Sequence, residues 1–84
     1  MRADELLADQ QNHGEFKGVT VRKGTVGAFL VNARIWSAPS TSASGRLDAE
    51  RDIVAALPAL RALGLFEVLD VRDEKLRAWI AVSG

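Results

Sequence analysis

Apolar residues recur at helical intervals between residues 25 and 36. Five of them lie three or four positions apart and form one stripe of a helix: Val26, Phe29, Leu30, Ala33 and Trp36. Val31 and Ile35 lie off this stripe, and only Asn32 and Arg34 are strongly polar. We therefore expect a helix that is apolar around most of its circumference. It is either buried on two sides within the monomer or covered on one side by a second chain.

A second, longer helix is predicted over residues 47–63. Its core face consists of Ile53, Val54, Leu57, Leu60 and Leu63. Three acids occupy its first turns, and Gly64 supplies a C-terminal stop. Pro58 removes an amide donor inside this helix and so predicts a kink, or a break into two helices near Leu57. The small, hydroxyl-rich residues 37–46 predict a flexible internal linker between the two helices.

Two further segments are typical of β-strands. Residues 15–23 contain the β-branched run Val19-Thr20-Val21, with Gly18 marking a bulge. Residues 65–71 are apolar on both alternating faces, as in a strand covered on each side. Residues 73–82 fit both a helix capped by Asp73 and the return strand of a hairpin, and their composition favours the helix. A short helix is also expected over residues 3–11, ending near residues 12–14.

These elements define an α+β fold in a single domain of residues 1–84. Their order is α-β-α-linker-α-β-α, with a small two- or three-stranded sheet packed against two main helices. We expect residues 1–14 to contain a loosely packed N-terminal helix and residues 37–46 to form the linker. A two-stranded sheet is marginal, so we expect a third strand within 76–82 or a second copy of the chain to complete the core. The predicted core consists of Val19, Val21, Phe29, Leu30, Ala33, Ile53, Leu57, Leu60, Leu65, Val68, Trp79 and Ile80.

The composition excludes several classes of protein. The chain has 84 residues, with 11 Lys and Arg, 11 Asp and Glu and no cysteine, which excludes disulfides, thiolate metal sites and cysteine nucleophiles. No apolar run approaches the roughly 20 residues that cross a bilayer, and the acidic first residues do not fit a signal peptide. We therefore expect a cytoplasmic protein that does not associate with membranes.

Basic residues gather in the middle of the sequence. Residues 17–35 carry Lys17, Arg22, Lys23 and Arg34 and no acid. At the predicted strand-to-helix turn, Arg22, Lys23, Gly24 and Thr25 combine free amides, a hydroxyl and two cations that can hold a phosphate or carboxylate. This turn predicts, as an alternative function, a small anion- or nucleotide-binding module. The same cations suggest weak nucleic-acid binding, which the zero net charge disfavours.

The chemistry-bearing side chains predict no active site. His13 is the only histidine. Asp9, four residues earlier, has the spacing of a second metal ligand, but no third ligand and no catalytic partner is tied to His13 by spacing. We therefore expect no enzyme activity, no metal and no cofactor. The leading expectation is a small non-catalytic protein that acts through an unknown protein partner and through self-association as a homo-oligomer. Val31, Ile35 and Trp36 are the predicted interface residues.

Two sequence blocks resemble a small family of uncharacterised bacterial proteins. The blocks are RKGTVGAFLVNA, residues 22–33, and LPALRALGLFEV, residues 57–68. Together they cover about a third of the chain. The resemblance implies a short stand-alone bacterial protein, and it carries no activity, substrate or site residue with it.

Overall fold

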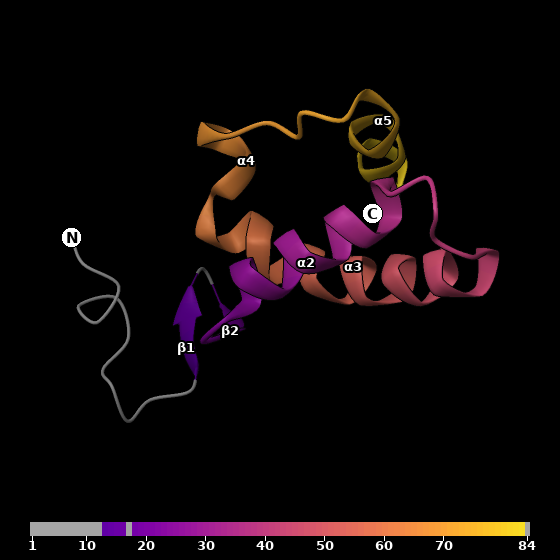
Figure 1. Ribbon diagram of the computed structural model, residues 1–84. Helices are drawn as coiled ribbons and strands as arrows, with labels where there is room; N and C mark the ends of the chain where they lie inside the picture. The colour runs from indigo at the N-terminus through magenta and orange to yellow at the C-terminus, as the bar shows by residue number, and fades with distance from the viewer. Residues whose placement is uncertain (1–12, 17, 84) are drawn as a thin grey trace.

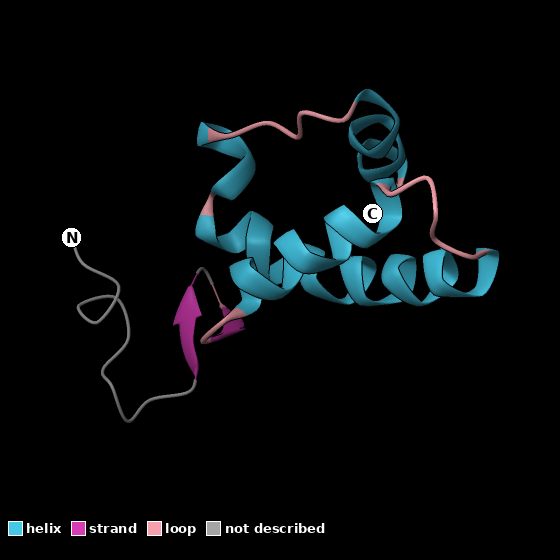
Figure 2. Ribbon diagram, viewed as in Figure 1, coloured by secondary structure: helices cyan, strands magenta, loops and turns pink. Residues whose placement is uncertain are grey.

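Helices dominate the computed structural model, which describes residues 13–16 and 18–83 (Figures 1 and 2). The strands β1 (His13–Phe16) and β2 (Val19–Arg22) come first. They are followed by four helices: α2 (Thr25–Ser37), α3 (Ala43–Leu63), α4 (Leu65–Val68) and α5 (Glu74–Val82). The helix predicted over residues 3–11 lies outside the described residues, whereas residues 13 and 14, the end of the predicted N-terminal segment 1–14, belong to strand β1 and not to a helix.

The two strands form one antiparallel hairpin. His13 pairs with Arg22 and Phe16 pairs with Val19. Gly18 lies in the tight turn between the strands with a φ of +78°, a conformation that glycine adopts without steric cost. The single strand predicted over residues 15–23 is therefore wrong in its extent, and Gly18 marks a turn and not a bulge.

Helix α2 confirms the helix predicted over residues 25–36. Its preceding residue, Gly24, has a φ of +88°, so the chain turns sharply from β2 into the helix. The hydroxyl of Thr25, the first residue of the helix, donates a hydrogen bond to the carbonyl oxygen of Arg22 at 2.7 Å. The hydroxyl thus stabilises the turn and not the helix end.

The connection between α2 and α3 is much shorter than predicted. Only residues 38–42 are non-helical, because α3 begins at Ala43 and not at residue 47. The hydroxyl oxygen of Ser42 accepts a hydrogen bond from the amide of Gly45 at 3.0 Å and caps the helix. Thr41 donates its hydroxyl hydrogen to the carbonyl oxygen of Ile35 at 2.6 Å. The hydroxyl-rich tract therefore makes specific turn and cap contacts and is not a linker over residues 37–46.

Helix α3 runs unbroken through Pro58 and ends at Gly64, whose φ is +82°. The predicted C-terminal stop is confirmed, and the predicted break near Leu57 does not occur. Pro58 itself is exposed, whereas Leu57, Ala59 and Leu60 on either side of it are buried. Packing of these neighbours outweighs one missing backbone hydrogen bond.

The strand predicted over residues 65–71 is wrong. Leu65–Val68 form the single helical turn α4, and an extended segment over residues 69–73 then leads to α5 (Figure 1). The helix favoured for residues 73–82 is confirmed by α5. Its predicted cap is confirmed as well, since Asp73 accepts a hydrogen bond from the amide of Leu76 at 2.9 Å. Among the described residues the order is therefore β-β-α-α-α-α. The sheet has two strands, so the alternative of a third strand within residues 76–82 is wrong.

The core lies mainly where α2, α3 and α5 meet. Its buried side chains are Val21, Phe29, Trp36, Ala49, Ile53, Leu57, Ala59, Leu60, Leu76 and Ile80. Three residues that the sequence assigned to the core are exposed: Leu30 at 56%, Val54 at 43% and Val68 at 83%. Val68 lies on the outer side of the helical turn α4. In the predicted strand its side chain would have pointed into the core.

Candidate functional site

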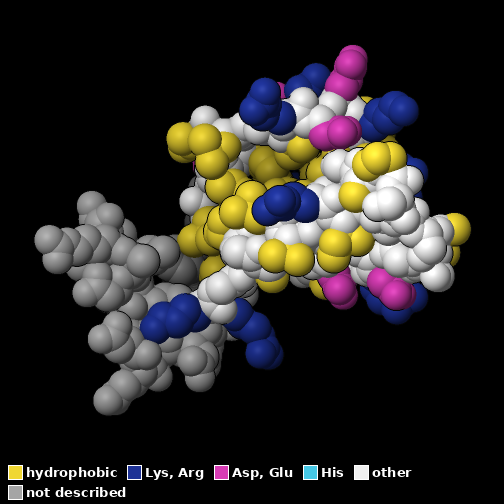
Figure 3. Space-filling view, in the orientation of Figure 1, with side chains coloured by type: hydrophobic (Ala, Val, Ile, Leu, Met, Phe, Trp, Pro, Cys, Tyr) yellow, Lys and Arg dark blue, Asp and Glu magenta, His cyan; other side chains and the backbone are white. Residues whose placement is uncertain are grey.

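A groove of about 500 Å³ lies between α2 and the chain from α4 to the start of α5. Its α2 wall consists of Val26, Phe29, Leu30 and Ala33. The opposite wall consists of Leu65, Phe66, Leu69 and Val71, and Leu76 of α5 completes the lining. Figure 3 shows this face as a hollow lined by hydrophobic side chains. The groove is therefore an apolar depression open to solvent.

Charged side chains line the edges of the groove. Arg34 lies on the α2 side, and Asp70, Arg72 and Asp73 lie on the opposite side. Figure 3 shows Lys and Arg side chains above and below the hollow. The two positive and two negative charges of these residues cancel. Which of them can interact with a ligand therefore depends on which side chains already have partners within the chain.

Both acids of the groove edge already have partners within the chain. The carboxylate of Asp70 accepts a hydrogen bond from the amide of Val71 at 2.9 Å and lies 3.9 Å from Nη1 of Arg77. Asp73 caps α5 through the amide of Leu76. For the side chains of Arg34 and Arg72, the described part of the chain contains no hydrogen bond or ion pair. The two arginines therefore supply the unmatched charge of this edge.

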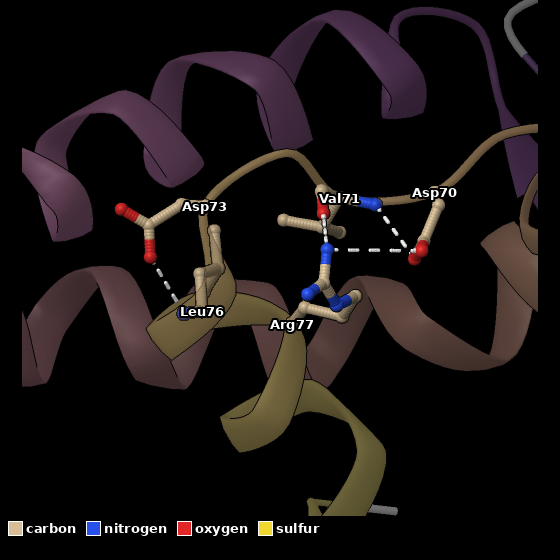
Figure 4. Close-up of polar contacts among 5 residues, drawn as sticks. All are labelled: Asp70, Val71, Asp73, Leu76 and Arg77. Atoms are coloured by element: carbon tan, nitrogen blue, oxygen red, sulfur yellow. Dashed lines mark hydrogen bonds and ion pairs between the residues drawn. The ribbon is translucent and has the colours of Figure 1, made fainter.

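The wall of the groove over residues 70–73 is held by a small polar network (Figure 4). Arg77, one turn into α5, reaches back and donates a hydrogen bond from Nη1 to the carbonyl oxygen of Val71 at 3.0 Å. Together with the Asp70 contact, this bond satisfies the amide and the carbonyl of Val71, in a segment that belongs to no helix or strand. The groove wall is thus fixed before any ligand arrives.

Two of the three predicted interface residues lie on the outer side of α2. Val31 is 59% exposed and Ile35 is 38% exposed. At 3.6 residues per turn they lie one above the other, and Gly27 and Ala28 precede them on the same side, both exposed. We call Gly27, Ala28, Val31 and Ile35 the outer strip of α2. It carries no charge, and its two smallest members leave room for close approach of another surface.

Trp36, the third predicted interface residue, belongs to the core. Its side chain is 6% exposed, and its indole N–H donates a hydrogen bond to Glu50 Oε2 at 2.8 Å. The ring lies 6.0 Å from the ring of Trp79, and the guanidinium of Arg46 lies 4.0 Å above it. The sequence pattern missed this polar anchor because Glu50 and Trp36 are joined only by the packing of α3 on α2.

The predicted anion site forms the exposed turn before α2. Arg22, Lys23 and Gly24 are exposed, and Thr25 is half-buried. Among the described side chains, none accepts a hydrogen bond at the N-terminal cap of α2. The turn therefore brings the four predicted residues together with helix amides that lack a side-chain acceptor.

The part of the chain that the structure describes contains no group of three His, Cys, Asp or Glu side chains placed to hold a metal ion. None of its helices has the length and apolar character needed to span a membrane. No protein-family model, curated protein or solved structure matches the chain.

Proposed function

We propose that this protein is non-catalytic and acts through protein–protein contacts, including self-association through the outer strip of α2. The observation that carries the proposal is the exposure of Val31 and Ile35 beside Gly27 and Ala28 on a helix whose opposite side is buried. Burial of these apolar side chains against a second copy removes them from water at a gain of about 25 cal/mol per Å².

The outer strip suits a twofold pairing of two α2 helices. A twofold axis brings the same surface of both copies together, so a strip without charge creates no like-charge contact in its centre. Gly27 and Ala28 allow the two helix backbones to approach, while Val31 and Ile35 supply the buried area. The small hairpin and core of each copy are left unchanged by this arrangement.

Sedimentation equilibrium over a wide range of protein concentration tests the proposal. We expect the wild-type mass to rise with concentration, and Val31→Glu to remain a monomer because it places two carboxylates in the interface. Val54→Glu is the matched control, since Val54 is an exposed valine of α3 outside the strip. A wild-type chain that stays monomeric at every concentration would contradict self-association.

A second candidate function is the binding of a small anion at the turn of Arg22, Lys23, Gly24 and Thr25. It is supported by helix amides without a side-chain acceptor beside exposed cations. Titration with inorganic phosphate should shift the amide resonances of residues 24–27, and Arg22→Gln should weaken the response. Unchanged resonances at high phosphate would reject this candidate.

A further inference from the structure

We infer that the groove between α2 and residues 65–76 binds a short amphipathic helix of a partner protein, with acidic residues flanking its apolar stripe. The inference rests on the proposed function, because it assigns a partner class to a surface next to the outer strip. It is carried by three features of the groove: its length, its unmatched charge and its apolar rims.

The length of the groove matches a few turns of helix. Its lining residues on α2 run from Val26 to Ser37, which is 11 steps of about 1.5 Å, or about 16 Å. Apolar side chains at positions i, i+3, i+4, i+7, i+8 and i+11 of a bound helix would span this distance and enter the groove. Phe29 and Phe66 meet edge to face at 5.9 Å between ring centroids, and both line the groove.

The charge of the groove edges selects an acidic partner. Arg34 and Arg72 stand on opposite sides, while Asp70 and Asp73 are engaged with Val71, Arg77 and Leu76. A helix lying between the arginines would therefore meet a cation on each flank. Glutamate or aspartate on those flanks is complementary, whereas lysine there is repelled.

The exposed rims favour a protein helix over an acyl chain with a carboxylate head. Leu30 on one rim is 56% exposed, and Leu69 on the other is 59% exposed. A single hydrocarbon chain in the groove would leave most of this surface in water. A helix is about 10 Å wide with its side chains and would cover both rims.

The wall around Val71 lowers the cost of binding. Its backbone carbonyl is already bonded to Arg77, and Asp70 and Asp73 fix the chain on either side (Figure 4). A partner helix therefore does not need to order this segment when it binds.

Two fluorescent peptides of about 15 residues, long enough for a helix to form, test the inference. Both carry the same leucine stripe in an alanine-rich helix; one has glutamates on its flanks and the other has lysines at the same positions. We expect the full chain to bind the acidic peptide about tenfold more tightly than the basic one. Amide resonances of Val26, Ala33 and Phe66 should shift on binding.

Charge exchange makes the test specific. The double variant R34E/R72E should reverse the preference and bind the basic peptide more tightly. R51E/K75E removes the same number of cations at exposed positions outside the groove and should keep the preference for the acidic peptide. Circular dichroism of each variant checks that its helices are intact.

Several results would overturn the inference: equal binding of both peptides, no reversal in R34E/R72E, or resonance shifts outside the groove. Binding of dodecanoate in the groove by a chain that ignores the acidic peptide would assign the site to a lipid instead. The proposed self-association is measured separately by sedimentation of the same samples. A chain that associates but binds neither peptide therefore rejects this inference alone.

Discussion

The indole N–H of Trp36 is a polar group in the core, and its partner Glu50 stands on another helix at 2.8 Å. Removal of the acceptor leaves a donor without a hydrogen bond in a largely apolar site. We predict that Glu50→Ala lowers the free energy of unfolding by about 1–3 kcal/mol and that Glu50→Gln, which keeps an acceptor, lowers it less.

Urea unfolding followed by tryptophan fluorescence measures both changes. Asp48→Ala is the control, because Asp48 is highly exposed and makes only a 3.7 Å ion pair with Arg51. Its free energy of unfolding should stay within about 0.5 kcal/mol of the wild-type value. Equal losses in Glu50→Ala and Asp48→Ala would show that the indole contact contributes nothing specific.

Gly64 is a second residue that contributes to the stability of the fold, because it adopts a left-handed backbone conformation. Its φ of +82° is costly for any residue with a Cβ, and an added Cβ would lie 2.5 Å from Glu67 Oε2. We predict that Gly64→Ala lowers the free energy of unfolding by about 1–2 kcal/mol.

Gly27→Ala, the same change at another glycine, should raise the free energy of unfolding where Gly64→Ala lowers it. Gly27 lies inside α2 with open space around its Cα, so alanine should raise the free energy of unfolding by about 0.5–1 kcal/mol. Both variants are compared in urea at a protein concentration low enough to keep the chain monomeric. Stabilisation by both substitutions would refute the role given to the left-handed conformation of Gly64.

At the scale of elements, we expect the segment between α4 and α5 to affect peptide binding more than it affects the free energy of unfolding. Arg77 is its main clamp, yet its contacts with Val71 and Asp70 are exposed. We predict that Arg77→Ala changes the free energy of unfolding by less than about 0.5 kcal/mol. Hydrogen exchange of residues 70–73 should become faster, and the acidic peptide should bind several-fold more weakly because the wall is no longer pre-organised.

Lys75→Ala is the matched control for this clamp. Lys75 is an exposed cation of the same helix that does not line the groove. It should leave both hydrogen exchange and peptide affinity unchanged. A large decrease in the free energy of unfolding of Arg77→Ala would instead show that the contacts of Arg77 are needed for folding, and would contradict the prediction.

Helices α2, α3 and α5 were predictable because each carries its own local signals. The apolar spacing identified α2, Gly64 marked the end of α3, and Asp73 marked the start of α5. Residues 65–71 were mispredicted because a run of apolar residues fits a covered strand as well as a turn of helix. Only packing decides between them: Phe66 meets Phe29, while Val68 points to solvent.

The groove itself could not be predicted from the sequence. Its walls come from α2 and from residues 65–76, which are distant in the chain, and both pack against α3. The outer strip was partly predictable, since Val31 and Ile35 lie off the apolar stripe of α2. Trp36 was assigned to the interface because periodicity does not show the Glu50 and Arg46 contacts that keep it inside.

At the scale of the whole molecule, a small core limits the stability of one copy. Among the described residues, the largest fully buried side chains are those of Ile53, Leu57, Leu60 and Leu76. An 84-residue chain also buries a smaller share of its surface than a larger domain does. Association through the outer strip would therefore add a significant part of the total stability. In the proposed association only folded chains pair with one another, so the equilibrium between folded and unfolded chains would depend on protein concentration.

This linkage predicts a melting temperature that rises with protein concentration. For a chain of this length, each tenfold increase should raise the Tm by about 4 °C once the associated form predominates. Val31→Glu should melt at one temperature at every concentration, and Val54→Glu should keep the wild-type slope. Differential scanning calorimetry measures all three proteins. A concentration-independent wild-type Tm would mean that the apolar side chains of α2 contribute no self-association to the folded state, and that the groove alone is left to engage a partner.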